Sequence, residues 1–523
     1  MQIINPTSTL EHPASHAADE ATRTDRTGRS PLDVIARAVF SFPALLGALL
    51  VAAPFVSLRN FTLDSDIWWH LKVGQAILAM HHWPSADTYS FAAPGTPWMA
   101  NEWIGEVLLA ATHQAFGLQG LLALNLALGG AILLALYGLA SLRSGNSKAA
   151  FVACAVLVFL TAVLFTLRPQ MLGYLFLIIT LIILERFRLG RARTLWLLPA
   201  LFLLWVNTHG SFVFGIFAFG VYVVSGLVKI RWGGLESVPW TAGERLRLGS
   251  VFLASLIALA ITPYGIRLAG FPLEMAYSHP MVAANIQEWQ PMPFNTQTGK
   301  LFLALLIGFL LAQAILRFTW HLAEYALFLF GIIAACLHAR FVMVFVPFCA
   351  PPLAVILKRW LAPYEPRKDK YGLNAILMVG VIVAMVRFFP SRAQLERRVA
   401  QQWPVKAVQY LQQHPPARPM FNNYEYGGYL IYALDDQNKV FIDGRTDMYE
   451  HSGVFSDYLR IGRATPDALL LLQKYNVQSC LIGREEALAT ILAASSQWQR
   501  AYSDDLCVLF VRQGVRGLGV ASR

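Results

Sequence analysis

The feature that most constrains this chain is a series of apolar runs, each near the length that crosses a membrane as a helix. A helix needs about 20 apolar residues to span roughly 30 Å of bilayer hydrocarbon, and about eleven segments approach that length. They lie at roughly 36–57, 118–141, 149–167, 171–185, 195–207, 211–229, 249–262, 300–317, 321–337, 341–357 and 372–389. Only 14% of the 523 residues are charged, against about 25% in a soluble globular protein. The sequence therefore predicts a polytopic α-helical membrane protein with about eleven transmembrane helices.

Lysines and arginines indicate how these helices are oriented. Residues 1–35 are polar and rich in Thr and Arg, and we expect them to be disordered and cytoplasmic. With that start, the cytoplasmic side carries 20 lysines and arginines and the opposite side 6, as the positive-inside rule requires. The net charge of +11 is then an orientation signal, and no nucleic-acid partner is expected. We predict a multi-pass protein of the inner (plasma) membrane.

The residues from about 394 onward follow a different pattern. Strands are predicted near 418–421, 439–443, 478–483, 498–502 and 506–512, helices near 466–475 and 485–494, and an amphipathic stretch at 395–413. This alternation predicts a C-terminal α/β domain, 394–523, and an odd number of spans places it in the periplasm or outside the cell. Cys480 and Cys507 lie on predicted strands, where they form either a disulfide or two buried thiols.

Within the membrane domain, 36–393, the long first outer loop 58–117 carries the most unusual polar residues. It contains Asp64-Ser65-Asp66 followed by His70, and later Glu102. Two carboxylates at positions i and i+2 can hold a divalent cation, or one can act as a base while the other orients it. The nearby tryptophans are typical of an aromatic belt at the membrane interface, but such a belt does not explain the acidic residues.

The other outer turns add cations, an imidazole and a further carboxylate to the same face. Arg168, His209, Glu288 and Arg340 all lie in connections on that side. An ionisable group at membrane depth is by default a candidate functional residue, although snorkelling or helix capping can explain any one of them. Arginines with carboxylates suit group transfer from a lipid-linked phosphate donor. No glycine-rich phosphate loop lies on the inner side, so nucleotide-driven chemistry there lacks support.

Three segments of the chain resemble motifs of the GT-C superfamily of integral-membrane glycosyltransferases. They are Asp64-Ser65-Asp66-Ile67-Trp68-Trp69-His70, Asn285-Ile286-Gln287-Glu288 and Asn423-Tyr424-Glu425-Tyr426-Gly427-Gly428-Tyr429. They come in the same order as the first-loop Asp, the Thr-Ile-x-Glu motif and the Trp-Trp-Asp-Tyr-Gly motif of the oligosaccharyltransferase catalytic subunit. Asn285 stands in place of the Thr, and Tyr424-Glu425 stands in place of Trp-Asp.

This resemblance implies an enzyme that transfers a sugar or glycan from a polyprenyl-phosphate-linked donor to a glycan, lipid or protein acceptor on the exoplasmic face. Asp64 or Asp66 would be the general base, or a ligand of a divalent metal, Mg²⁺ or Mn²⁺, that orients the acceptor. Glu288 would be a further catalytic residue, in contact with the metal or with the acceptor. The implied substrate-binding residues are His70, Glu102, Arg168, His209, Arg340 and Tyr426.

The C-terminal domain contributes two further candidates by their position. Asp443 and Arg445 directly follow the predicted strand 439–443, and ligand contacts concentrate at the carboxyl ends of strands in α/β domains. They are either substrate contacts or an Arg–Asp pair in a polar turn.

Two functions from other classes are compatible with a membrane protein of this kind. A glycan or lipid transporter, or flippase, predicts polar residues through the inner part of the bundle as well, and the sequence shows few there. A non-catalytic scaffold leaves Asp64, Asp66 and the outer arginines without a role. Membrane lipids are partners in each case.

Overall fold

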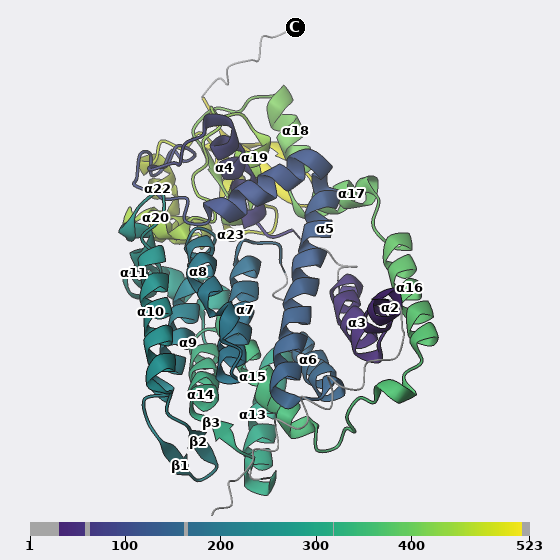
Figure 1. The fold of residues 1–523 in the computed structure, drawn as a ribbon. Helices are drawn as coiled ribbons and strands as arrows, with labels where there is room; N and C mark the ends of the chain where they lie inside the picture. Colours follow the sequence, from purple (N-terminus) through teal and green to yellow (C-terminus); the bar gives the residue numbers. More distant parts are fainter. Residues whose placement is uncertain (1–30, 58–62, 162–165, 317, 515–523) are drawn as a thin grey trace, which may run out of the picture.

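The structure is a computed structural model that describes residues 31–57, 63–161, 166–316 and 318–514. Most of the predicted N-terminal segment 1–35, and residues 58–62 of the first outer loop, lie outside these described ranges. The chain forms a long helical bundle with a small sheet-containing domain at one end (Figure 1).

Each predicted apolar run coincides with one or two helices of the bundle. These are α2 (Pro31–Val39), α3 (Phe42–Ser57), α5 (Trp103–Ser144), α6 (Ser147–Thr161), α7 (Gln170–Arg188), α8 (Leu198–Val206), α9 (Phe212–Ser225), α10 (Ala242–Ala258), α13 (Gln297–Leu316), α14 (Leu322–Leu337), α15 (Val342–Leu357) and α16 (Tyr371–Arg387).

The predicted number of spans is not confirmed. Among the described residues, four helices are long and apolar enough to cross a membrane, or up to six if each of two bent pairs is one span. The four are Trp103–Ser144, Gln170–Arg188, Gln297–Leu316 and Ala339–Leu357. Shorter apolar helices occupy several of the other predicted positions. The protein is therefore a multi-pass membrane protein.

Helix α5 bends sharply at Gly117, and the two parts of the helix run in different directions. Gly117 has φ 60° and ψ −152°, a conformation that a residue with a Cβ adopts only under strain. The first part of α5 lies across the end of the bundle near α4 (Asp66–Met80), and the remainder runs through the bundle (Figure 1). The bend explains why only 118–141 looked like a span in the sequence.

The two ends of the bundle differ in what covers them (Figure 1). One end carries α4 and several short elements between the long helices. These short elements are α11 (Ile266–Ser278), α12 (Pro280–Asn285), η3 (Gln287–Trp289) and η4 (Ala339–Phe341). The opposite end carries a three-stranded sheet, with η2 and η5 in neighbouring connections: β1 (Ile230–Trp232), β2 (Leu235–Ser237), β3 (Trp320–His321), η2 (Ala192–Leu197) and η5 (Pro366–Lys368). We call the first end the outer end and the second the inner end.

The C-terminal segment packs on the outer end and contains the predicted mixture of helices and strands. The elements are α17 (Arg392–Gln402), α18 (Val405–Gln413), β4 (Met420–Asn422), α19 (Tyr424–Ala433), α20 (Thr446–His451), α21 (Val454–Gly462), α22 (Ala468–Lys474), β5 (Ser479–Gly483), α23 (Ala487–Ala494), β6 (Trp498–Ser503) and β7 (Cys507–Arg512). The sheet order is β4-β5-β7-β6, with β4 parallel to β5 and the other pairs antiparallel. Four of the five residues of β5 are buried, as its apolar sequence predicts for a central strand.

The structure corrects one predicted strand of this domain and decides between the two alternatives for its cysteines. Residues 439–443 do not form a strand of the sheet. Instead, Val440 makes an isolated β-bridge with Ser90 of the first outer loop. The Asn422 side chain also holds this segment: its Oδ1 accepts from the Phe441 N–H (2.7 Å), and its Nδ2 donates to the Ile442 carbonyl (2.8 Å). The two cysteines of the sheet are buried free thiols and not a disulfide.

Candidate functional site

Eight predicted site residues from separate parts of the chain come together at the outer end. They form two neighbouring groups, which we call the arginine cluster and the histidine cluster. The arginine cluster consists of Asp64, Asp66, Arg168, Glu288 and Arg340. The histidine cluster consists of His70, Glu102, His209 and one residue that the sequence analysis missed, Glu106.

The arginine cluster is organised around one guanidinium. Nη2 of Arg168 lies 2.5 Å from Oδ1 of Asp64 and 3.2 Å from Oδ2 of Asp66, while Nη1 lies 3.7 Å from Oε1 of Glu288. Nη1 of Arg340 lies 3.2 Å from the same Glu288 oxygen, and its guanidinium stacks over the Trp289 ring at 4.3 Å. Three carboxylates are thus matched by two guanidiniums, both less than a fifth exposed.

The start of α4 places the two aspartates. Oδ1 of Asp64 accepts a hydrogen bond from the Asp66 N–H (3.0 Å), a local turn that aspartate side chains favour at helix starts. The acidic pair is also favourable there because the helix N-terminus carries a partial positive charge. The indole N–H of Trp69 donates to Oδ1 of Asp66 (3.2 Å). Local hydrogen bonds at the helix start thereby help to orient the aspartate pair.

Two glycines of the C-terminal domain allow its backbone to lie directly on this helix start. A Cβ at Gly444 would stand 1.9 Å from Oδ1 of Asp66, and a Cβ at Gly428 would stand 2.5 Å from the Ser65 carbonyl oxygen. Real side-chain atoms do not approach so closely. The C-terminal domain therefore forms one wall of the arginine cluster, and only glycine fits at these two contacts.

The histidine cluster alternates acids and imidazoles. Nδ1 of His70 lies 3.2 Å from Oε1 of Glu106, and its Nε2 lies 3.6 Å from Oε2 of Glu102. Nε2 of His209 lies 3.4 Å from Oε1 of Glu102. Since Nδ1 of His209 accepts from the Ser211 N–H (3.0 Å), Nε2 carries the proton of the neutral ring. Glu106 follows Glu102 by four residues on α5, a spacing that places both on one helix face and could have identified Glu106 in the sequence.

Burial changes the ionisation of both clusters. Desolvation, opposed by Arg168 and reinforced by Asp64, raises the pKa of Asp66 to about 7. Desolvation likewise raises the pKa of Glu102 to about 8. Desolvation, followed by the charges of Arg340 and Arg168, lowers the pKa of His209 to about 3. Desolvation, followed by the charge of Arg168, lowers the pKa of His70 well below its ordinary value. Near neutral pH, Asp66 can therefore gain or lose a proton, while Glu102 and both imidazoles are neutral.

Asp443 and Arg445 form a buried clamp. Nε and Nη2 of Arg445 bond Asp443 at 2.8 and 2.7 Å, Nη1 lies 2.8 Å from Oδ1 of Asp87 in the first outer loop, and the Tyr449 hydroxyl donates to Asp443 (2.6 Å). The three charged side chains are at most 1% exposed. Of the two alternatives for Asp443 and Arg445, the structure shows the Arg–Asp pair, and a substrate contact at these residues stays a prediction.

Tyr426 also lies apart from the clusters, because its hydroxyl donates to the Leu506 carbonyl (3.3 Å) inside the C-terminal domain. Its neighbour Tyr424 faces the arginine cluster: burial first, and then the charges of Asp66 and Glu425, raise the pKa of the Tyr424 phenol well above its ordinary value. The predicted motif thus lies at the site, but a different tyrosine of that motif points toward it.

The predicted metal ligands do not converge on one point. Asp64, Asp66 and Glu288 contact two different nitrogens of Arg168, and no group of three or more His, Cys, Asp or Glu residues within the described ranges is placed to hold a metal ion. A divalent cation requires several oxygens at roughly 2.0–2.6 Å from a single centre. The arrangement present does not fit a three-carboxylate metal site.

A second buried polar cluster lies at the inner end, and none of its residues is among the predicted site residues. Arg143 makes two bonds with Glu324, both of 3.0 Å, and Arg188 makes two with Glu185, of 2.9 and 2.5 Å. The Tyr222 hydroxyl donates to Glu185 (3.3 Å). These residues and His321 line one cavity. We call them the inner cluster.

Comparison with known proteins shows similarity in fold to two kinds of membrane enzyme. The Archaeoglobus fulgidus oligosaccharyltransferase tethered with an acceptor peptide containing the NVT sequon aligns over 86% of this chain and 70% of its own, with a TM-score of 0.51 and 14% identity. The archaeal oligosaccharyltransferase AglB from Archaeoglobus fulgidus, in complex with an inhibitory peptide and a dolichol-phosphate, aligns over 84% of this chain and 69% of its own. Its TM-score is 0.50 and its sequence identity 13%. ArnT from Cupriavidus metallidurans in the apo state aligns over 92% of this chain and 97% of its own, with a TM-score of 0.51 and 15% identity.

No protein-family model and no curated protein matches the chain. The similarity is therefore one of architecture, extending over most of the chain at low sequence identity. Both kinds of enzyme are GT-C glycosyltransferases. As the resemblance predicted, the chain shares the fold of these enzymes.

Proposed function

We propose that this chain is a GT-C-type membrane glycosyltransferase that transfers a sugar or glycan from a polyprenyl-phosphate-linked donor to an acceptor at the outer end. The observation that carries the proposal is the arginine cluster, in which Asp66 lies against Arg168 and Arg340 lies within reach of the same group of carboxylates. A base beside two guanidiniums supplies what glycosyl transfer from a phosphate needs, namely a proton acceptor and a stabilised leaving group.

In the proposed reaction, a nucleophilic oxygen or nitrogen of the acceptor forms a bond with the anomeric carbon of the donor sugar. The bond between that carbon and the phosphate oxygen breaks, and its electron pair leaves with the polyprenyl phosphate or diphosphate. The proton of the acceptor passes to the Asp66 carboxylate. Asp66 suits this role better than Asp64, because Asp64 is held by Arg168 at 2.5 Å, whereas the pKa of Asp66 is near neutral.

Arg340 is the favoured partner for the departing phosphate. Its single ion pair to Glu288 uses Nη1 (3.2 Å), and its face rests on Trp289, so the guanidinium is oriented by its neighbours. Arginine binds phosphate oxygens through two parallel hydrogen bonds, a geometry that lysine cannot reproduce. His209 and Glu102, both partly exposed beside this position, are candidate contacts to sugar hydroxyls.

The similar structures support a lipid-linked donor and a separate acceptor in general terms. One of the similar oligosaccharyltransferases is in complex with a dolichol-phosphate, which is a polyprenyl phosphate, and another is tethered with an acceptor peptide. The charge asymmetry of the connections supports an inner-membrane orientation with the outer end and the C-terminal domain exoplasmic. Tyr424 and Glu425, at the wall formed by that domain, would contact the acceptor.

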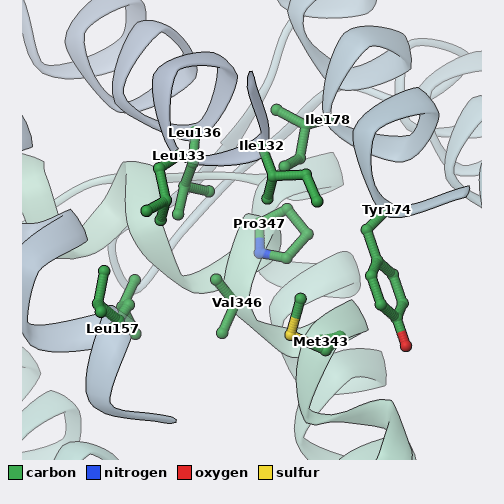
Figure 2. Close-up of a pocket in the computed structure, with 10 residues that line it drawn as sticks. Ile132, Leu133, Leu136, Leu157, Tyr174, Ile178, Met343, Val346 and Pro347 are labelled. Carbon is green, nitrogen blue, oxygen red and sulfur yellow. The ribbon is translucent and has the colours of Figure 1, made fainter. Parts of the chain in front are cut away.

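A transporter or flippase is the second candidate, because the inner cluster supplies the buried polar residues that transport predicts. The residues between the two ends argue against it. Along α7, Tyr174 and Ile178 follow Arg168 and precede Glu185, and along α15, Met343 and Val346 follow Arg340. Figure 2 shows these side chains around a cavity whose other labelled residues are aliphatic. A polar headgroup crossing between the ends would have to pass this apolar layer.

The proposal is tested in cells that normally make the protein. Removing it and restoring either the wild type or Asp66→Asn should show, by mass spectrometry of envelope glycans, that only the wild type restores the missing product. Asp505→Asn, which changes an exposed aspartate of the same protein, is the matched control and should restore it fully. In proteoliposomes, transfer releases free polyprenyl phosphate, whereas transport leaves the lipid-linked sugar intact. Full activity of a folded Asp66→Asn protein would refute the assigned base.

A further inference from the structure

We propose that the guanidinium of Arg168 is the permanent cation of the outer site and takes the place of a divalent metal there. A metal among Asp64, Asp66 and Glu288 is what their sequence pattern suggests. In the structure all three carboxylates instead contact Arg168, at 2.5, 3.2 and 3.7 Å. The part of this inference that concerns the reaction rests on the proposed function, but cation binding does not.

The position of Arg168 is set by packing that does not involve the carboxylates. Pro169 presses against the first turn of α5, where a Cβ at Gly105 would stand 2.5 Å from the Pro169 ring. The carbonyls of Arg168 and Pro169 accept the first backbone hydrogen bonds of α7, from Met171 (3.1 Å) and Leu172 (3.0 Å). The guanidinium therefore extends from a fixed backbone into the space between the three carboxylates.

The charges of the neighbourhood leave little attraction for a second cation. Arg168 and Arg340 together already carry two positive charges against three carboxylates. A divalent ion bound to the same oxygens would lie within a few ångströms of Arg168, and unit charges repel strongly at that distance in a poorly solvated site. The nearby imidazoles of His70 and His209 do not compensate, because burial keeps them neutral.

This inference has a consequence that can be measured without any substrate. If Arg168 replaces a metal, its removal leaves two aspartates and one glutamate close together without their shared cation. Such a group of carboxylates is what Mn²⁺ and Mg²⁺ bind. The Arg168→Gln protein should therefore gain a cation site that the wild type lacks.

The experiment titrates Mn²⁺ into the full-length protein in nanodiscs and follows free Mn²⁺ by electron paramagnetic resonance. We expect no stoichiometric binding to the wild type and at least tenfold tighter binding to Arg168→Gln. Adding Asp64→Asn and Asp66→Asn to Arg168→Gln should abolish the gain. Arg340→Gln is the matched control, because it frees only one carboxylate, and it should gain no site.

Thermal unfolding supplies the second readout. EDTA and Mn²⁺ should leave the melting temperature of the wild type unchanged, whereas Mn²⁺ should raise that of Arg168→Gln. Arg168→Lys keeps the positive charge and serves if Arg168→Gln does not fold; it should bind no Mn²⁺. Stoichiometric Mn²⁺ binding by the wild type or by Arg168→Lys would overturn the inference, as would a folded Arg168→Gln protein that gains no site. A failure of the proposed function would appear separately, as an absence of transfer by a protein that behaves as expected here.

Discussion

The replacement of Arg445 by methionine is the perturbation whose outcome most directly separates the two interpretations of the C-terminal polar residues. Arg445 joins Asp443 of the C-terminal domain to Asp87 of the first outer loop, and all three side chains are at most 1% exposed. Methionine preserves much of the length and apolar stem of arginine but removes the charge. The change therefore leaves two buried carboxylates without a counter-charge.

The expected loss of stability follows from that geometry. Removing one partner of a buried ion pair destabilises a protein by about 3–5 kcal/mol. One guanidinium here serves two carboxylates, so we expect the upper end, about 5 kcal/mol. Although burial alone would raise it, Arg445 holds the pKa of Asp443 below its ordinary value. The stabilisation from Arg445 is thus present above the pKa of an unfolded aspartate and lost as the pH falls, and the deficit of Arg445→Met should shrink in acid.

The assay is thermal unfolding of the nanodisc-embedded protein at several pH values, combined with limited proteolysis of the first outer loop. Arg484→Met is the matched control, because Arg484 is exposed in the same domain, and it should unfold like the wild type. Neutralising both aspartates in Arg445→Met, by Asp443→Asn and Asp87→Asn, should recover part of the lost stability. If Arg445→Met unfolds like the wild type but fails to transfer sugar, the clamp is refuted and a substrate contact is supported.

Four further outcomes follow from the same structure. The transfer rate should rise with pH and level off with a midpoint of about 7, since Asp66 must be deprotonated to accept a proton; a rate that is flat from pH 5 to 9 would contradict this role. The unfolding free energy of the wild type should fall as the pH rises from about 4.5 to about 8, because Glu102 holds its proton over that interval in the folded state and loses it when unfolded. Chemical unfolding measures this, and Glu102→Gln should make the unfolding free energy depend less on pH. Gly444→Ala should reduce the transfer rate at least tenfold with a smaller effect on folding, because the added Cβ would displace Asp66. A normal transfer rate would show that the backbone of the C-terminal domain shifts to accommodate the Cβ. Glu324→Gln should destabilise the inner cluster by about 3 kcal/mol while transfer per folded molecule is unchanged, and a specific loss of transfer would couple the two ends.

The sequence predicts the position of helices well and their division into spans poorly, for a physical reason. The length of an apolar run reports how much of a helix contacts lipid or other helices, so each predicted run coincides with a helix. The run does not report bends. Gly117 turns the first part of α5 across the outer end, and the break between α2 and α3 bends that segment by 46°.

Most of the candidate site was predictable because its residues lie outside the predicted apolar runs. Asp64, Arg168 and Arg340 are polar residues beside apolar runs, and the alternation of spans places such connections on one side of the membrane. Glu106 was missed because its partner His70 lies 36 residues away in the chain. Glu185 pairs with Arg188, three residues later in the same helix, and its contact with Tyr222 joins positions 37 residues apart.

The pairing of residues, as opposed to their side of the membrane, is what the sequence could not supply. Asp87 and Arg445 are separated by most of the chain, and only the packing of the C-terminal domain on the first outer loop makes them partners. The same holds for Arg168, which a linear reading assigns to a phosphate while the fold surrounds it with carboxylates. Nη2 of Arg168 is already engaged by both aspartates and Nη1 lies 3.7 Å from Glu288, while Nε has no hydrogen-bond partner among the described residues. Our proposal assigns the leaving group to Arg340, and it gives Arg168, which is held by the aspartates, the role of setting the charge and position of the base.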